Sequence, residues 1–256
     1  MPAAEPGAPA RPVSAAGPVR FAAHADEQAW SEAVCAAVLQ AVQEERRSRG
    51  APLLLLAGGE SPAPAYRRLA EAWPSFHEPA ARITVSLVDE RWVEPGAAGS
   101  NEEMLRRTLL DRAGPGACFW PLADHAAGLA ASVRLANARL AAAPNAPSLV
   151  LLGMGEDGHT ASMFPGSPDL QSALASTVPY CAVDARGCAA AGPWARRITL
   201  TPAGWRFARK RLLVIRGERK RRVFEQALRE RDAQTFPVCA AFAVGEAPLE
   251  VHWAPA

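Results

Sequence analysis

The stretch LLGMGEDGHTASMFPG, residues 151–166, decides the fold class because it joins an apolar run to a glycine-rich loop. The run at 148–152 is short and bounded, which is typical of a buried strand. Four glycines within 153–166 predict a tight, irregular backbone after that strand. Asp157 and His159 stand two residues apart in the loop, and histidine titrates near neutral pH, so the pair suits general-base chemistry. The alternative interpretation is a capping aspartate beside a structural histidine.

The same order of strand, polar turn and helix recurs along the chain. An apolar run at 52–57 leads into the turn at 58–62 and a helical pattern at 63–71. A second run at 83–88 ends at Asp89-Glu90-Arg91, and Ser100-Asn101 then caps a helix over 102–110. Further strands are expected over 197–201, 211–215 and 240–244, and further helices over 26–49, 126–142, 204–208 and 218–229. Such alternation predicts an α/β fold, a largely parallel sheet with helices on both faces.

The polar motifs all fall where predicted strands end. Ligands of parallel sheets bind at the carboxyl ends of the strands, so we expect a single active-site rim there. In the first turn, Gly58 and Gly59 let the backbone approach an anion, the next helix offers free N–H groups, and Ser61 adds a hydroxyl. The turn matches neither a Walker A loop nor a dinucleotide fingerprint, and a plain connection is the alternative.

Charged residues complete the candidate site. Asp89 and Arg91 suit recognition of a polar ligand, although a surface ion pair is the alternative. Arg197 stands at the end of a predicted strand and Lys220 at a helix start, where both could close on a phosphate. The surrounding arginines are interpreted as a solvated basic face.

Composition excludes several classes of protein. The chain has 28 Lys+Arg against 26 Asp+Glu, a net charge of +2, and its arginine cluster lacks interleaved aromatics, so no nucleic-acid partner is expected. No apolar run reaches the roughly 18–20 residues of a membrane span. Five scattered cysteines without a CxxC predict free thiols in a cytoplasmic protein, and no metal-ligand spacing is present.

The two ends of the chain differ in composition. Residues 1–18 are rich in Ala, Pro and Gly, which predicts a disordered tail without the apolar region of a secretory signal. Residues 19–256 are expected to form a single α/β domain, and we expect a monomer.

Five segments together resemble the 6-phosphogluconolactonase family, within the larger group that includes glucosamine-6-phosphate deaminase and ribose-5-phosphate isomerase. They are LLLLAGGESP at 53–62, VDERWV at 88–93 with Ser100-Asn101 following, the loop at 151–166, RITLTP at 197–202 and GERK at 217–220. They come in the family's order and span roughly residues 20–253. The long glycine loop is the most specific of them.

The resemblance implies a modified Rossmann-like domain that hydrolyses 6-phospho-D-glucono-1,5-lactone to 6-phosphogluconate without a cofactor, the second step of the oxidative pentose phosphate pathway. His159 would be the general base, and Asp157 would orient it or hold a sugar hydroxyl. Arg91 would lie near the reacting lactone oxygens, with Asp89 holding hydroxyls or Arg91. The remaining implied contacts, all to the substrate and mostly to its phosphate, are Gly58, Gly59, Ser61, Arg197 and Lys220.

Two other functions compete with the lactonase. A deaminase or isomerase of phosphosugars needs a carboxylate five residues after the histidine, where this chain has Phe164. A non-catalytic phosphosugar sensor would be joined to a DNA-binding segment, for which residues 1–18 are too short. One departure from the family concerns Glu60, which replaces the usual small hydroxyl residue and places an anion near the expected phosphate.

Overall fold

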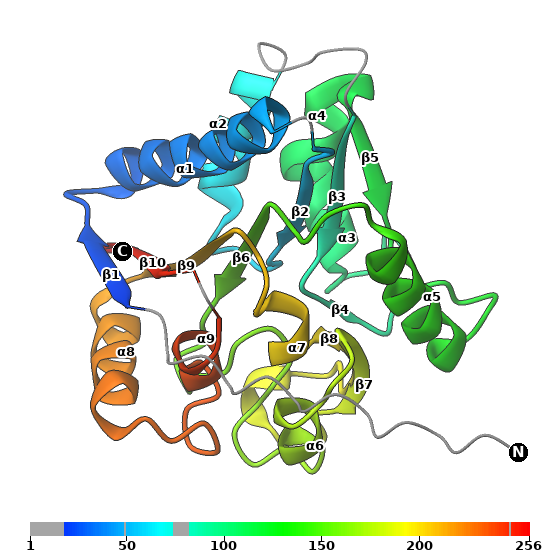
Figure 1. Cartoon of the computed structure of the whole chain (residues 1–256). Helices are drawn as coiled ribbons and strands as arrows, with labels where there is room; N and C mark the ends of the chain where they lie inside the picture. The colour runs from blue at the N-terminus through cyan, green and yellow to red at the C-terminus, as the bar shows by residue number, and fades with distance from the viewer. Residues whose placement is uncertain (1–17, 49, 74–81, 246) are drawn as a thin grey trace, which may run out of the picture.

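The computed structural model describes residues 18–48, 50–73, 82–245 and 247–256. Residues 1–17 of the expected tail lie outside this part of the chain. Within it, a main sheet of seven parallel strands is accompanied by a small antiparallel sheet (Figure 1). In spatial order the main sheet consists of β1 (Val19–Ala23), β10 (Leu249–Ala254), β9 (Lys210–Arg216), β6 (Leu149–Gly153), β2 (Leu53–Leu56), β3 (Ile83–Leu87) and β5 (Ala117–Trp120). The predicted α/β fold with a largely parallel sheet is confirmed.

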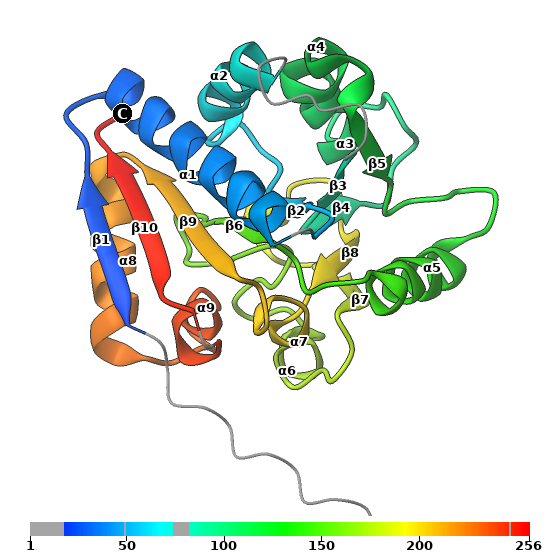
Figure 2. The ribbon, with the colours of Figure 1, turned by 45° about the horizontal axis from the view of Figure 1, so that its top comes forward.

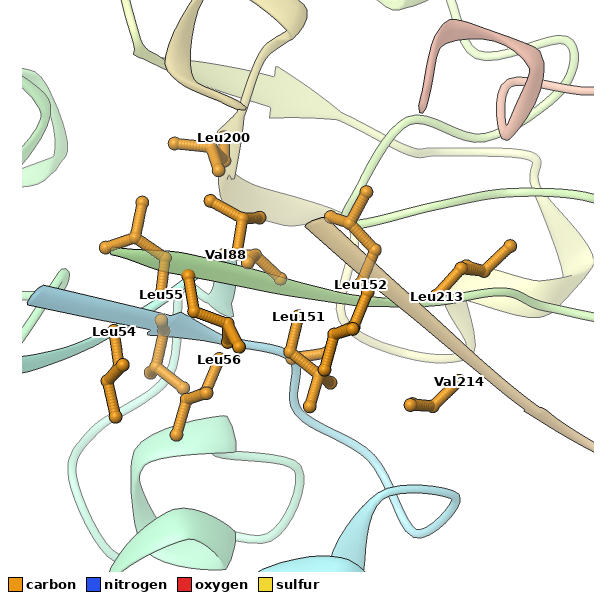
Figure 3. Packing of buried hydrophobic residues seen from close by; sticks show 14 of the residues in the cluster. Leu54, Leu55, Leu56, Val88, Leu151, Leu152, Leu200, Leu213 and Val214 are labelled. Atoms are coloured by element: carbon orange, nitrogen blue, oxygen red, sulfur yellow. The ribbon is translucent and has the colours of Figure 1, made fainter. Parts of the chain in front are cut away.

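The central strands are apolar throughout because both of their faces are covered. All four residues of β2 are at most 3% exposed, and the leucines and valine of β6 are fully buried. A strand covered on both faces reads as a continuous apolar run rather than an alternating one. Figure 3 shows these side chains on both faces of the central strands, with Leu200 packed over one of the two faces.

Helices cover both faces of the main sheet. They are α1 (Glu27–Arg47), α2 (Ala63–Ala72), α3 (Asn101–Leu105), α4 (Asp111–Ala113), α5 (Leu129–Ala142), α6 (Leu170–Leu174), α7 (Pro202–Trp205), α8 (Glu218–Glu230) and α9 (Cys239–Ala243). Asp26 caps α1 as predicted, since its carboxylate accepts a 2.8 Å hydrogen bond from Ala29 N. Figures 1 and 2 show α1 on one side of β1, β10 and β9, and α8 on the other. No helix of the described residues is long and apolar enough to span a bilayer.

Two predicted segments belong to the small sheet instead of the main one. Its strands are β4 (Asp89–Arg91), β8 (Arg196–Leu200) and β7 (Tyr180–Asp184), all paired antiparallel. The chain passes from β3 through Val88 into β4 without a helix between them, so 89–91 is a strand rather than the turn after one. Arg91 is the register partner of Arg197 in this pairing, which sets the two arginines side by side.

One predicted strand is wrong. Residues 240–244 lie mostly in helix α9, and the last strand is β10, which the sequence analysis did not predict. Strands β1, β5 and β7 were also not predicted. The residues of α9 from Cys239 to Phe242 are all buried, and a short, fully buried apolar run has no periodicity that separates helix from strand.

The order of the strands reverses between β2 and β6. From β2 the sheet continues through β3 to β5, while from β6 it continues in the other direction through β9 and β10 to β1. Loops that leave neighbouring strands at such a switch point diverge and leave a crevice at the carboxyl ends. The two glycine-rich loops, at 58–62 and 154–166, leave these two strands.

Candidate active site

A cavity of about 200 Å³ opens between the loops that follow β2 and β6. All nine predicted site residues line it except Asp157. The predicted residues in its wall are Gly58, Gly59, Ser61, Asp89, Arg91, His159, Arg197 and Lys220. The wall also contains residues for which no role was predicted, among them Glu60, Asn101, Gly155 and Ala161. The single rim predicted from the strand ends is therefore present.

Asp157 lies behind His159 and holds its ring. The Asp157 Oδ1 atom is 2.6 Å from His159 Nδ1 and accepts a 3.1 Å hydrogen bond from the backbone N–H of His159. Burial opposes the charge of Asp157, but the hydrogen bond and charge of His159 outweigh it and lower the pKa of the carboxyl. With Nδ1 engaged by the carboxylate, Nε2 is the ring nitrogen left for a ligand.

Gly155 allows this close pairing. A β-carbon at position 155 would overlap the Nδ1 and Cε1 atoms of His159 and would lie 2.6 Å from Asp157 Oδ1. The backbone N–H of Gly155 also donates to the carbonyl of His159 at 2.9 Å. The φ of Gly155 is not positive, so the backbone conformation does not require glycine. The lack of space for a β-carbon does.

Phe164 fills the space between the imidazole and Arg197. Its ring is 1% exposed, its centroid lies 4.4 Å from that of His159, and the guanidinium of Arg197 lies 4.9 Å from the same centroid. An aromatic ring thus occupies the place where a deaminase would need a carboxylate.

The first loop meets the start of helix α8 across the cavity. Lys220 Nζ donates a 3.0 Å hydrogen bond to Ser61 Oγ, and burial lowers the pKa of Lys220. Gly59 has a φ of +82°, a conformation that L-residues rarely adopt. The Glu60 side chain is 83% exposed at the mouth, where its Oε1 atom lies 3.7 Å from the guanidinium of Arg107. The Glu60 carboxylate, which was expected near the phosphate, is therefore turned outward and paired with Arg107.

The strands of the small sheet supply a carboxylate and two guanidinium groups. Asp89 Oδ2 accepts a 2.6 Å hydrogen bond from Ser162 Oγ and lies 3.9 Å from Arg197 Nη1. Arg197 is 2% exposed and donates to the carbonyls of Trp194 and Ala191 at 2.9 and 2.7 Å. Burial lowers the pKa of Arg197. Its donors are thus largely committed to the protein, which the sequence did not indicate.

Arg91 and Asn101 also line the cavity. Arg91 donates to the carbonyl of Gly99, and its guanidinium lies 5.5 Å from the ring centroid of Trp194. Asn101 was predicted only as part of a helix cap, yet its side chain lines the cavity and donates to the carbonyl of Asp89 at 2.8 Å. Its place beside Ser100 in a family segment was the signal that could have identified it.

Histidine, cysteine and carboxylate side chains outside the cavity form no metal site in the described part of the chain. The described residues contain no group of three or more His, Cys, Asp or Glu side chains that could hold a metal ion. The five cysteines are free thiols.

Comparison with known proteins gives a consistent result. Residues 25–253 match the family described as glucosamine-6-phosphate isomerases/6-phosphogluconolactonase. The chain is 42% identical over 228 residues to a 6-phosphogluconolactonase of Xylella fastidiosa, with 89% of this chain and 93% of the relative covered. It is 35% identical over 240 residues to the enzyme of that name from Pseudomonas aeruginosa, with 89% and 94% covered. A solved 6-phosphogluconolactonase from Shewanella baltica has a TM-score of 0.82 and 28% identity, with 94% and 100% covered.

Proposed function

The chain belongs to the family of glucosamine-6-phosphate isomerases and 6-phosphogluconolactonases, and on that premise we propose that it hydrolyses 6-phospho-D-glucono-1,5-lactone to 6-phosphogluconate. This is the second step of the oxidative pentose phosphate pathway. One observation carries the proposal: a single cavity is lined both by the His159 imidazole and by the hydrogen-bonded pair of Ser61 and Lys220. A base and an anion-binding group in one small cavity are what a phosphorylated lactone requires.

The proposed mechanism begins with a water molecule between His159 and the lactone carbonyl. His159 Nε2 takes a proton from this water as its oxygen attacks C1, and Asp157 stabilises the resulting imidazolium through Nδ1. The carbonyl oxygen becomes an oxyanion, which the positive charge of Arg91 stabilises. When the intermediate collapses, the bond from C1 to the ring oxygen breaks, and His159 returns its proton to that oxygen.

The phosphate is proposed to bind where the first loop and Lys220 line the cavity. Lys220, Ser61 and the backbone of Gly58 and Gly59 would contact its oxygens, which suits an ammonium and a glycine loop at a helix start. Arg197 would contribute mainly through its charge, because its N–H groups already donate to carbonyls. A phosphate fixed in this way holds C1 against the base, which lowers the entropic cost of reaction.

The site supports hydrolysis better than deamination. Isomerisation with loss of ammonia needs a second acid or base, and position 164 holds a buried phenyl ring packed on the imidazole. A non-catalytic sensor would not need the carboxylate that orients His159. The proposed substrate is a small molecule, and the enzyme is proposed to act as a monomer; the free cysteines support a cytoplasmic location.

The proposal is tested by following acid release from freshly prepared 6-phosphogluconolactone, with the spontaneous hydrolysis subtracted. We expect His159→Ala to lower kcat by at least about 100-fold with little change in KM, because a positioned base typically contributes 10²–10⁴-fold. Lys220→Ala should instead mainly raise KM, by about 10-fold or more. His125→Ala is the matched control, since that imidazole lies outside the cavity and contacts the carbonyl of Val93. Unchanged turnover in His159→Ala would reject the assigned base.

A further inference from the structure

Glu90 stands between two residues of the cavity but does not line it. In strand β4, Asp89 and Arg91 face the cavity, and successive side chains of a strand point to opposite sides. Glu90 is 3% exposed and points toward the start of helix α3. Neither the predicted site nor the proposed mechanism gives this buried carboxylate a role.

Both oxygens of the Glu90 carboxylate are occupied. Oε1 accepts hydrogen bonds from the backbone N–H groups of Arg91 and Asn101, at 2.8 and 2.7 Å. Oε2 accepts one from Glu102 N at 2.7 Å and one from Ser100 Oγ at 3.3 Å. N–H groups at the start of a helix have no partner within the helix, so this side chain provides one for two of them.

These contacts close a ring around Arg91. Glu90 holds the backbone of Arg91 at one end, and at the other end it holds residues 100–102, which directly follow Gly99. Gly99 supplies the carbonyl that accepts from the guanidinium of Arg91. Asn101 closes a second link, because its side chain donates to the carbonyl of Asp89 at 2.8 Å. The carboxylate of Glu90 thus fixes both Arg91, which carries the guanidinium, and the segment after Gly99, whose carbonyl orients that guanidinium.

We propose that Glu90 is a positioning residue that fixes the guanidinium of Arg91 against the reacting end of the substrate and holds the amide of Asn101 in the wall of the cavity. The proposal rests on the proposed lactonase function, in which Arg91 stabilises the oxyanion. Glu90 itself touches no substrate and acts through the strand and helix ends that it joins. Displacement of a catalytic group by about 1 Å can cost about 100-fold in rate, so its loss should be visible in turnover.

An ionised carboxylate suits this position better than another polar side chain, because four donors converge on its two oxygens and it offers acceptors only. Burial raises the pKa of Glu90 to about 7 against the effect of these hydrogen bonds, so the assay is run above that pH, where the ionised form dominates. In Glu90→Gln one oxygen becomes an NH₂ group, which would face N–H or O–H donors at 2.7–3.3 Å. The variant keeps the size of the side chain but breaks one half of the ring.

The test compares Glu90→Gln with Glu102→Gln in the acid-release assay. Glu102 is a matched control on the same helix start, because its carboxylate pairs with Arg106 at 2.8 Å and its backbone N–H is retained. We expect Glu90→Gln to lower kcat by about 10- to 100-fold with a smaller change in KM, and Glu102→Gln to stay within about threefold of wild type. Equal kcat values for the two variants would overturn the positioning role.

A double-mutant cycle with Arg91→Ala separates positioning from general loss of structure. If Glu90 acts through Arg91, Glu90→Gln should cost less than about threefold in the Arg91→Ala background, because residues that act as a unit are not additive. Full additivity would overturn the proposal.

Should Glu90→Gln fail to fold, Ser100→Ala removes one donor to the same carboxylate. A kcat loss of about two- to fivefold is then expected, and an unchanged kcat would count against the role. Wild-type protein without lactonase activity would overturn the proposed function, and with it the role of Glu90.

Discussion

Gly155 illustrates how a single hydrogen atom in place of a side chain permits the His159–Asp157 pair. Gly155→Ala places a methyl group where the imidazole now lies, so the ring must turn or shift. We expect kcat to fall by about 10- to 100-fold while the fold persists, because the φ at this position suits alanine. Steady-state kinetics with circular dichroism checks this.

Gly153→Ala is the comparison variant for this prediction. A β-carbon there would meet only the Ala57 β-carbon at 3.9 Å, an ordinary contact. We expect a much smaller loss of kcat than in Gly155→Ala. Similar losses in the two variants would show that the imidazole is not the group displaced.

The residues of the site divide into those that local sequence reveals and those that it does not. The spacing of Asp157 and His159 in a glycine loop was enough to single out both residues, because they lie in one short segment, but it left open whether Asp157 holds the imidazole or a sugar hydroxyl. The burial of Arg197 and the inward turn of Glu90 depend on how β4 pairs with β8 and abuts α3. That pairing joins segments over 100 residues apart, and no local pattern encodes it.

The secondary structure shows the same division between local and non-local information. Helices α1 and α8 were predicted to within a few residues, since α1 has a capping aspartate and both carry apolar residues at helical spacing beside a polar face. Helix α9 was mistaken for a strand because four of its five residues are buried, and β10 was missed although it is the strand next to the edge strand β1. Short elements take their conformation from their neighbours, which composition does not show.

Strand β10 carries a buried histidine that should make folding sensitive to pH. His252 Nδ1 lies 3.1 Å from His24 Nε2, and the two rings are stacked. Burial, with the charges of His24 and Lys210, lowers the pKa of His252 from 6.5 to about 4. Between these values the unfolded chain binds more protons at this site than the folded one does. The contribution of His252 to the unfolding free energy is therefore present above pH 6.5 and is lost as the pH falls through about 4.

We predict that wild type loses about 2 kcal/mol more unfolding free energy than His252→Asn when the pH falls from about 8 to about 5. Urea unfolding of both proteins at both pH values measures this difference. Burial raises the pKa of Glu90 to about 7. The contribution of Glu90 to the unfolding free energy is therefore lost as the pH rises, which is the opposite of the effect of His252. Glu90 is present in both proteins and cancels in the comparison. Equal losses in the two proteins would contradict the prediction.

Across the sheet, the position of the site follows from one reversal of strand order. Because β2 and β6 are neighbours, the glycine-rich loop at 58–62 and the histidine loop at 154–166 lie together although about 90 residues separate them in the chain. The alternation of strands and helices predicted a rim at the carboxyl ends of the strands. It did not predict which two strands adjoin, because parallel strands pair across long connections whose ends carry no matching signal.

The C-terminal strand should be indispensable to the fold. It lies between β1 and β9, and its Leu249, Val251 and Trp253 side chains are at most 7% exposed. Buried side chains of this size contribute roughly 1.5–3 kcal/mol each, which together approaches the total stability of about 5–15 kcal/mol of a typical protein. We expect a chain ending at residue 248 to show no cooperative thermal transition. A chain ending at Ala254, which keeps β10, should melt close to wild type. A cooperative transition in the shorter chain would contradict this prediction.

The pairing of β1 with β10 also constrains when the main sheet can be completed during synthesis. Among the described residues β1 pairs with β10, which is made more than 200 residues later. Translation proceeds at about 5–20 residues per second, so β1 must remain without this partner for roughly ten seconds or more. The nascent chain can assemble the part around β2, β3 and β5 early, but the edge beside β9 closes only once residues 249–254 have been made.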